Sequence, residues 1–355
     1  MSWFLAFAGF AALIILHEAG HFAAAKAVGM RVERFSLFFP PYLARKRRGE
    51  TEYCVGIVPL GGFVRITGMN PEEKLPPEIA PRGYYHQPVW KRIFVIGAGP
   101  VVNILIAFVL LFFLAFDFAK NDTSVADIKP NSAAAEALRP GDRILSVDGR
   151  TGDPSDVARQ ISSHKCEGEP RPGCRAATPA VLRVERDGRV VTVRVRPRYN
   201  ADAKRTVIGF SFGNTPLNPS VPEAARLAGE VMWDVTSRTV ETIVQIFNPD
   251  RREEISGVVG SYEVTRQAFN FGIREAISIL ALISLSLGVI NLFPFLPLDG
   301  GHIFWSLVEK IRGRPVPFRV MEQSGVLGFM LVAFLFIVGL SNDIGRLTGD
   351  GFGQR

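Results

Sequence analysis

Two histidines and a glutamate lie close together near the N-terminus, in the segment LHEAGH at residues 16–21. On an α-helix His17 and His21 are four residues apart and project from one face, near enough to share a metal ion. Imidazole nitrogens suit zinc, which lowers the pKa of a coordinated water to about 7. Glu18, on a neighbouring face, would accept a proton from that water. The HExxH pattern therefore predicts a hydrolytic zinc site on a helix.

A catalytic zinc takes three protein ligands and keeps a fourth position open, so one more ligand is required. The segment NLFPFLPLDGGH, residues 291–302, offers Asp299 and His302, and spacing alone does not choose between them. Pro294 and Pro297 should break a helix there. Freed backbone at membrane depth is tolerated only where it is buried in protein or lines a cavity. We therefore expect this segment to contribute to the site.

The motif lies in a very apolar chain, in which 47% of the 355 residues are hydrophobic. Four apolar runs approach the roughly 20 residues that span a bilayer. They cover about residues 2–29, 93–118, 275–297 and 324–341. The first run lacks a basic segment before it and is interpreted as a retained anchor. Ionisable groups inside a span are costly and mostly mark function, so a metal-free buried histidine pair is the weaker interpretation.

Basic residues are concentrated in two connections between the predicted spans. The net charge is +7, with basic clusters at residues 45–48 and 310–319. By the positive-inside rule both connections are cytoplasmic, which places the two termini and the segment 119–274 outside. The HExxH motif and Asp299 then meet on the cytoplasmic side of the bilayer. No nucleic-acid recognition motif accompanies the basic residues, so no nucleic-acid partner is expected.

The connections differ in composition. Within the cytoplasmic connection 30–92, residues 52–66 are rich in β-formers and interrupted by glycine and proline, which predicts a β-hairpin or loop at the membrane face. Residues 119–198 contain short strand-like runs between turns, which predicts a small β-rich domain. In the connector 199–274, residues 222–247 predict an amphipathic helix that lies on the membrane, covers the bundle or packs on the β-rich domain.

Several smaller features complete the pattern. Asn103, in the segment GPVVN of the second span, is expected to form a hydrogen bond across closely packed helices. Cys166 and Cys174 both fall in the outer segment, where an oxidising compartment permits a disulfide. Cys54 is assigned no role. The third span is expected to continue to residue 302. A cytoplasmic loop over residues 303–323 and a C-terminal tail over residues 342–355 complete the predicted organisation.

Residues 128–149, IKPNSAAAEALRPGDRILSVDG, resemble a PDZ domain of the bacterial protease-associated kind. PDZ domains bind extended peptides, often through a free C-terminus, at a sheet edge. This resemblance implies peptide termini as partners. The alternative is a β domain that only fills space or limits access.

Taken together, HEAGH, VPLGGFVRITGM, GPVVN, the PDZ-like insert and LDGGH make the chain resemble the site-2 protease family of intramembrane zinc metalloproteases, bacterial RseP type. The resemblance implies one zinc ion held by His17, His21 and Asp299, with Glu18 as catalytic base. It also implies a substrate contact at Asn291. A further implication is that the stretch 53–68, with Gly61 and Gly62, binds substrate as an added strand.

The implied fold is a polytopic α-helical membrane protein with about four transmembrane helices, a membrane-associated β element and an inserted PDZ-like domain. The implied substrates are single-span proteins of the bacterial inner membrane, such as anti-sigma factors or remnant signal peptides, already shortened by another protease. Two features depart from the family pattern: only one PDZ-like domain is present, and the second proline before Asp299 lies one residue late, at Pro297.

Two other classes of protein are alternatives. One is a non-catalytic PDZ-containing membrane scaffold with a structural metal. A structural site has no use for a base beside an open metal position, so Glu18 favours the enzyme. The other is a zinc transporter, although no polar path continues through the remaining spans.

Overall fold

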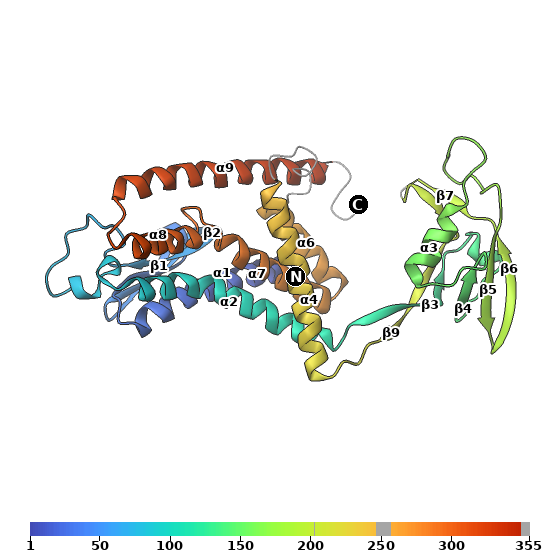
Figure 1. The fold of residues 1–355 in the computed structure, drawn as a ribbon, viewed down its shortest axis with the longest axis horizontal. Helices are drawn as coiled ribbons and strands as arrows, with labels where there is room; N and C mark the ends of the chain where they lie inside the picture. Colours follow the sequence, from blue (N-terminus) through green and yellow to red (C-terminus); the bar gives the residue numbers. More distant parts are fainter. Residues whose placement is uncertain (202, 246–256, 349–355) are drawn as a thin grey trace. The chain divides into compact units, whose positions relative to one another are not determined.

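The computed structural model describes residues 1–201, 203–245 and 257–348. They form two compact units, the first from Met1–Ala115 and the described residues after 220, the second from Phe116–Ser220. Four helices of the first unit are long and apolar enough to cross a membrane (Figure 1). These are α1 (Ser2–Ala27), α2 (Val89–Ala115), α7 (Ile273–Asn291) and α9 (Phe318–Thr348). The chain is thus a multi-pass membrane protein with a separate β-rich unit.

The last two spans differ from the sequence-based boundaries. The third span was expected to continue to residue 302, but α7 ends at Asn291 and a separate helix, α8 (Asp299–Arg312), follows. The prolines of the intervening segment interrupt the helix. The prediction of a loop over 303–323 is therefore wrong for its first ten residues. Helix α9 extends beyond 324–341 at both ends and occupies the tail through Thr348, while residues 349–355 lie outside the described chain.

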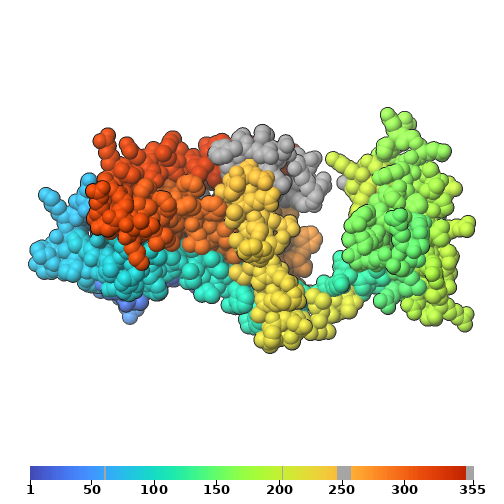
Figure 2. Space-filling model, in the orientation of Figure 1, coloured from blue at the N-terminus to red at the C-terminus, as the bar shows by residue number. Residues whose placement is uncertain are grey.

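The outward surface of α9 is apolar. Figure 2 shows α9, in red, on the outside of the first unit. Leu327, Phe329 and Ile337 each expose more than 60% of their surface there. Contiguous apolar exposure of this kind is unfavourable in water and is accommodated by lipid. The exposure therefore agrees with a transmembrane position for this helix.

Strands β1 (Val32–Arg48) and β2 (Thr51–Ile66) form the membrane-associated β element. Both strands bend, and each contributes two paired segments. The start of β1, residues 32–37, pairs with the end of β2, residues 62–66, and its residues 34–37 pair on the other side with residues 52–55 of β2. The end of β1, residues 44–48, pairs with residues 51–55 of β2. The expectation of a hairpin within 52–66 was too narrow. The partner of β2 is the preceding stretch, whose start VERFSLFF is also rich in β-formers.

The β element packs on the helices through a buried apolar cluster. Met30, Val32 and Ile66 contact Ala25 of α1 and Val95 of α2 in this cluster. Two 3₁₀ turns connect β2 to α2, namely η1 (Ala80–Arg82) and η2 (Tyr84–His86). The packing fixes the strand 62–66 beside the first two spans.

The second unit is built on a five-stranded antiparallel sheet with the order β6-β5-β4-β3-β9. Ile208, Phe210 and Phe212 pack in its core, and β9 pairs with β3, so the unit extends past the expected boundary at 198 to residue 220. Its elements are β3 (Ala119–Ile128), η3 (Ala134–Glu136), β4 (Arg143–Val147), α3 (Pro154–Ser163), β5 (Ala180–Arg186), β6 (Arg189–Val195), β7 (Arg198–Asn200), β8 (Arg205–Val207) and β9 (Phe210–Pro216).

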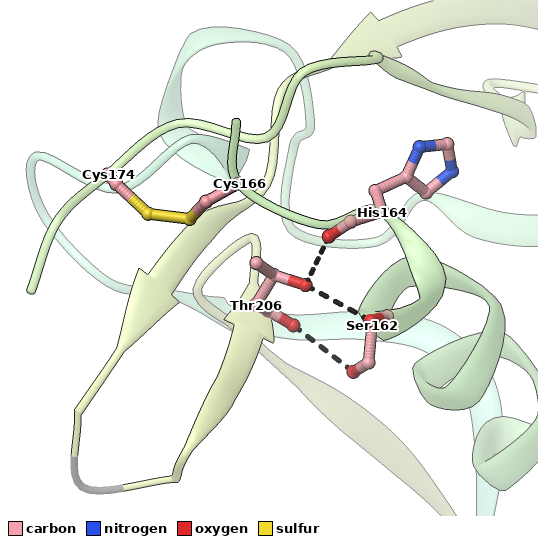
Figure 3. The surroundings of a disulfide bond; sticks show 5 residues. All are labelled: Ser162, His164, Cys166, Cys174 and Thr206. Atoms are coloured by element: carbon pink, nitrogen blue, oxygen red, sulfur yellow. Dashed lines mark hydrogen bonds between the residues drawn. A yellow bond between two sulfur atoms is a disulfide. The ribbon is translucent and has the colours of Figure 1, made fainter. Parts of the chain in front are cut away.

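A disulfide joins Cys166 to Cys174, with Cα atoms 6.2 Å apart, in the connection between α3 and β5 (Figure 3). Beside it, the Thr206 hydroxyl donates to the carbonyl of His164 at 2.7 Å, and the Ser162 hydroxyl donates to the carbonyl of Thr206 at 3.1 Å. These bonds attach β8 to the end of α3. Cys54 is a free, buried thiol in β2.

The amphipathic connector forms α4 (Val221–Val244), followed by α6 (Val258–Phe271). Ala228 of α4 is fully buried against Leu111 of α2 and Ala281 of α7. The helix therefore covers the bundle and belongs to the first unit rather than packing on the β-rich domain. The end of the expected helix, residues 246 and 247, lies outside the described chain.

Candidate metal centre

Three predicted ligands meet between α1 and the start of α8. The Nε2 atoms of His17 and His21 are 3.2 Å apart, and each lies 3.3 Å from Oδ2 of Asp299. Both imidazoles are buried. Across the parts of the chain that the structure describes, no other group of three His, Cys, Asp or Glu side chains converges in this way. His302, the competing candidate, is buried in α8 but is not a member of this group.

These separations fit a zinc ion. Ligand atoms about 2.0–2.1 Å from a tetrahedral zinc lie roughly 3.3–3.4 Å from one another. The distances of 3.2 and 3.3 Å between the donor atoms of His17, His21 and Asp299 are close to that spacing. Two imidazoles and one carboxylate form the three-ligand set that leaves a fourth position for water or substrate. The residues present therefore suit a catalytic zinc rather than a closed structural site.

Close packing of α1 against α2 orients the second histidine. A Cβ on Gly99 would overlap the His21 ring, and a Cβ on Gly20 would come 2.8 Å from the Ala98 carbonyl oxygen. Small residues at both positions let the helices approach closely. At this distance His21 Nδ1 donates to the carbonyl oxygen of Val95 at 2.9 Å. That bond leaves Nε2 free to bind a metal.

The break between α7 and α8 positions the carboxylate. Asp299 is the first residue of α8, where the unpaired N–H groups of a helix favour a negative charge. The next two residues, Gly300 and Gly301, are buried against the backbone of Leu292 and Leu296, with no room for a Cβ. The glycines of the LDGG segment therefore allow α8 to begin directly beneath the interrupted chain, and this places Asp299 against α1.

Glu18 and the predicted substrate strand lie side by side. A Cβ on Gly62 would come 2.9 Å from Cγ of Glu18 and 2.8 Å from the carbonyl oxygen of Ser36. Glycine is required there because the strand 62–66 passes directly over α1. Gly61 precedes it with a φ of 153°, a region that side chains other than glycine rarely adopt. Substrate paired with this strand would lie next to the expected base.

The two predicted asparagines occupy different surroundings. Asn103 is fully buried, and its amide nitrogen lies 3.2 Å from Nδ1 of His17. Its backbone carbonyl accepts a hydrogen bond of 2.9 Å from the Ser284 hydroxyl of α7. Asn291 is half-buried at the end of α7, immediately before the segment that leads to Asp299.

Two contributions to the site had no signal in the sequence. The Val95 carbonyl that orients His21 is a backbone group, which every residue carries. Arg92, which was counted among the basic residues of the cytoplasmic connection, is instead buried in α2 and donates to Glu309 of α8 at 3.0 and 2.5 Å. This ion pair joins α2 to α8, the helix that begins with Asp299, and only a contact between distant segments reveals it.

Comparison with known proteins agrees with this geometry. The model of peptidase family M50 matches residues 5–335. A Rhizobium meliloti protein provisionally named a zinc metalloprotease is 30% identical, over 95% of this chain and 94% of its own length. A Clostridium perfringens protein with the same provisional name is also 30% identical, over 94% of this chain and 96% of its own. The regulator of sigma-W protease RasP of Bacillus subtilis is 26% identical, over 95% and 97%.

The matched region includes the HExxH motif, the second and third spans, the β-rich unit, Asp299 and most of the first and fourth spans. The chain therefore belongs to peptidase family M50, the site-2 protease family of zinc metallopeptidases.

Proposed function

We propose that this metallopeptidase cleaves transmembrane segments of single-span proteins that another protease has already shortened, as in regulated intramembrane proteolysis. The observation that carries the proposal is the convergence of His17, His21 and Asp299, in which both histidines lie within a helix apolar enough to span the bilayer. An anti-sigma factor or a remnant signal peptide is the expected class of substrate. The name of RasP, a regulator of a sigma factor, supports the first of these.

In the proposed mechanism His17, His21 and Asp299 hold the zinc. When bound, zinc supplies a Lewis acid that polarises the peptide carbonyl and acidifies water at the open position. Glu18 accepts the proton from the attacking water and transfers it to the departing amide nitrogen, the two roles of a general base and acid. Its position one residue after His17 keeps the carboxylate beside the metal ligands.

A substrate helix must be extended before its backbone can reach this site. The strand 62–66 pairs with 32–37 on one side, and no strand of the described chain pairs with its other edge. An extended substrate can add to that edge through backbone hydrogen bonds. Because Gly62 contacts Glu18, pairing there would hold the scissile bond near the base. Asn291, at the end of α7, would contact the same substrate segment.

The charge distribution supports an orientation. Basic residues in the 30–92 and 303–323 connections support a cytoplasmic location for those segments, with both termini and the β-rich unit outside the cytoplasm. The metal centre would then face the cytoplasmic side. In the β-rich unit, β9 is the last strand in the sheet order, and its outer edge, which pairs with no strand of the described residues, would suit a PDZ-like contact with peptide termini. Such a contact would select substrates before they enter the membrane site.

The decisive experiment compares the purified protein with its Glu18→Gln variant on a single-span substrate truncated on its outer side. We expect cleavage to fall by about 10²–10⁴-fold while zinc content stays equal, since only the proton-transfer group is removed. Equal cleavage by both proteins would exclude Glu18 as the base. Inactivity of both, with zinc bound, would favour a non-catalytic scaffold.

The added-strand role has its own test. Proline at Gly61 or Gly62 removes a backbone donor from the edge near Glu18, and proline at Lys46 does the same at the opposite edge of the sheet. We expect only the first pair of variants to slow cleavage at unchanged zinc content. Unchanged turnover in the Gly61 and Gly62 variants would rule out strand addition at this edge.

A further inference from the structure

Asn103 is the most deeply buried polar side chain beside the metal centre. It lies on α2 with no exposed surface, and its amide faces Nδ1 of His17 at 3.2 Å. As placed, the Nδ2 amino group faces the ring, and the Oδ1 atom is buried without a hydrogen-bond partner in the described chain. A buried amide oxygen without a partner is unfavourable, because its lost hydration is not replaced by a hydrogen bond.

Binding of zinc by His17 requires the opposite orientation of the Asn103 amide. If His17 binds zinc through Nε2, its Nδ1 carries the hydrogen and must donate it. Facing the Nδ2 group of Asn103, that hydrogen would have no acceptor. A half-turn of the amide, whose two ends have nearly the same shape, brings Oδ1 to Nδ1. One rotation would then give the imidazole an acceptor and the amide oxygen a donor.

We infer that Asn103 is a positioning residue of the metal centre, accepting the Nδ1 hydrogen of His17 and so directing Nε2 toward the ion. This inference rests on the proposed zinc site and adds to it a residue that contacts a ligand rather than the metal. Both histidines would then donate their Nδ1 hydrogen to an acceptor, because His21 Nδ1 already donates to the Val95 carbonyl at 2.9 Å. Both acceptors come from α2.

The surroundings of Asn103 keep its side chain in place. The Ser284 hydroxyl donates to its backbone carbonyl, and a Cβ on Gly288 would come 3.3 Å from the Asn103 Cβ. Helix α7 therefore packs directly against this point of α2. Asn103 accordingly has little freedom to leave His17, which is what a fixed acceptor requires.

The test measures zinc affinity rather than cleavage. Full-length protein in detergent is titrated with zinc against a chromophoric chelator, for the wild type and for the Asn103→Leu, Asn103→Asp and Leu111→Ala variants. Leucine keeps the approximate volume but removes the acceptor, and we expect its Kd to rise about 10–100-fold. Aspartate keeps an acceptor and should bind zinc nearly as the wild type does. Leu111→Ala loosens the packing of α2 against α4 and α7 about two turns away from Asn103, and it should leave the Kd unchanged.

A second readout follows the geometry at the metal. With cobalt in place of zinc, the visible absorption band should shift in the leucine variant and remain in the aspartate variant. Wild-type affinity in the leucine variant would overturn the inference, as would an equal loss in the aspartate variant or in Leu111→Ala. If far-UV circular dichroism shows that the leucine variant does not fold, Asn103→Ala takes its place. Absence of zinc binding by the wild type would instead refute the proposed function.

Discussion

The two units of this protein differ in the polar side chains that they bury and in the surface that they expose. The core of residues 116–220 is made of aliphatic groups such as Ile144, Leu182 and Val184. The helical unit buries His17, His21 and Asn103 in addition to its apolar clusters, while large apolar side chains are exposed on its outside. The comparison shows how the surrounding medium decides what is hidden. In water, apolar groups gain by burial, whereas in lipid the polar groups must find partners inside the protein.

Each unit also contains one well-buried ion pair, and these make the comparison testable. In the β-rich unit Arg186 donates to both carboxylate oxygens of Asp142 at 2.7 Å, and Asp142 is only 1% exposed. In the helical unit Arg92 forms an ion pair with Glu309. If the units are independent, a substitution that destabilises one unit should not change the stability or zinc affinity of the other.

The largest expected change in stability follows from Arg186→Leu. Removal of this arginine leaves the Asp142 carboxylate buried without its partner, which costs about 3–5 kcal/mol. Hydrogen exchange of peptides from residues 116–220 should show this loss, while the zinc Kd stays at the wild-type value. Arg183→Leu, at an exposed position of the same strand, is the matched control. A parallel loss of zinc affinity would show that the units are coupled.

The same pair predicts a pH dependence. Hydrogen bonds from Arg186, and then one from the Arg139 backbone, hold the pKa of Asp142 below its ordinary value of about 3.9. Because the folded pKa is the lower one, the contribution of Asp142 is complete above the unfolded value and is lost as the pH falls through the folded value. Exchange protection of β4 and β5 should therefore be steady from pH 7 to about 5 and decline below about 4. The decline should be weaker in Arg186→Leu, and an equal decline there would exclude Asp142 as its source.

A smaller effect is expected from the disulfide. Cys166→Ser and Cys174→Ser together open a short loop, which the chain-entropy relation values at roughly 2–3 kcal/mol. Peptides of α3 and β8, which lie beside the bond, should lose protection first. Unchanged protection in the double variant would mean that the loop is already fixed by its hydrogen bonds. Zinc affinity again serves as the control from the other unit.

The smallest effect concerns packing at the metal centre. A methyl group at Gly99 would collide with the His21 ring, so Gly99→Ala should weaken zinc binding by about 10–100-fold, as the loss of an outer-shell contact does. A methyl group at Gly97 would meet only Ile303 at 3.9 Å, so Gly97→Ala should bind zinc as the wild type does. Equal affinities in the two alanine variants would contradict the assigned role of Gly99. Neither change should alter exchange in residues 116–220.

Sequence patterns were most informative where one segment contains the whole signal. The HExxH motif predicted which residues of α1 come together as candidate metal ligands, because residues four apart on a helix share a face. The four spans could be predicted from their length and apolarity alone. Sequence patterns were weaker for β1, for the end of the β-rich unit and for α8. Each of these depends on contacts between segments, such as the pairing of β9 with β3 or the contact of Gly300 with the backbone of Leu292 and Phe293.

By itself the sequence determined the chemistry, namely two histidines and a glutamate in an apolar helix and an aspartate after a proline-broken span. The residues alone left Asp299 and His302 as equal candidates, and only resemblance to a family favoured Asp299. The tertiary structure brought Asp299 to within 3.3 Å of both histidines and gave His21 the Val95 carbonyl. The physical reason is that the chemical type of a ligand is a property of its own residue, whereas the distances between ligands from separate segments depend on how those segments pack. Here the glycines at 20, 99, 300 and 301 let the helices approach closely enough to form the centre.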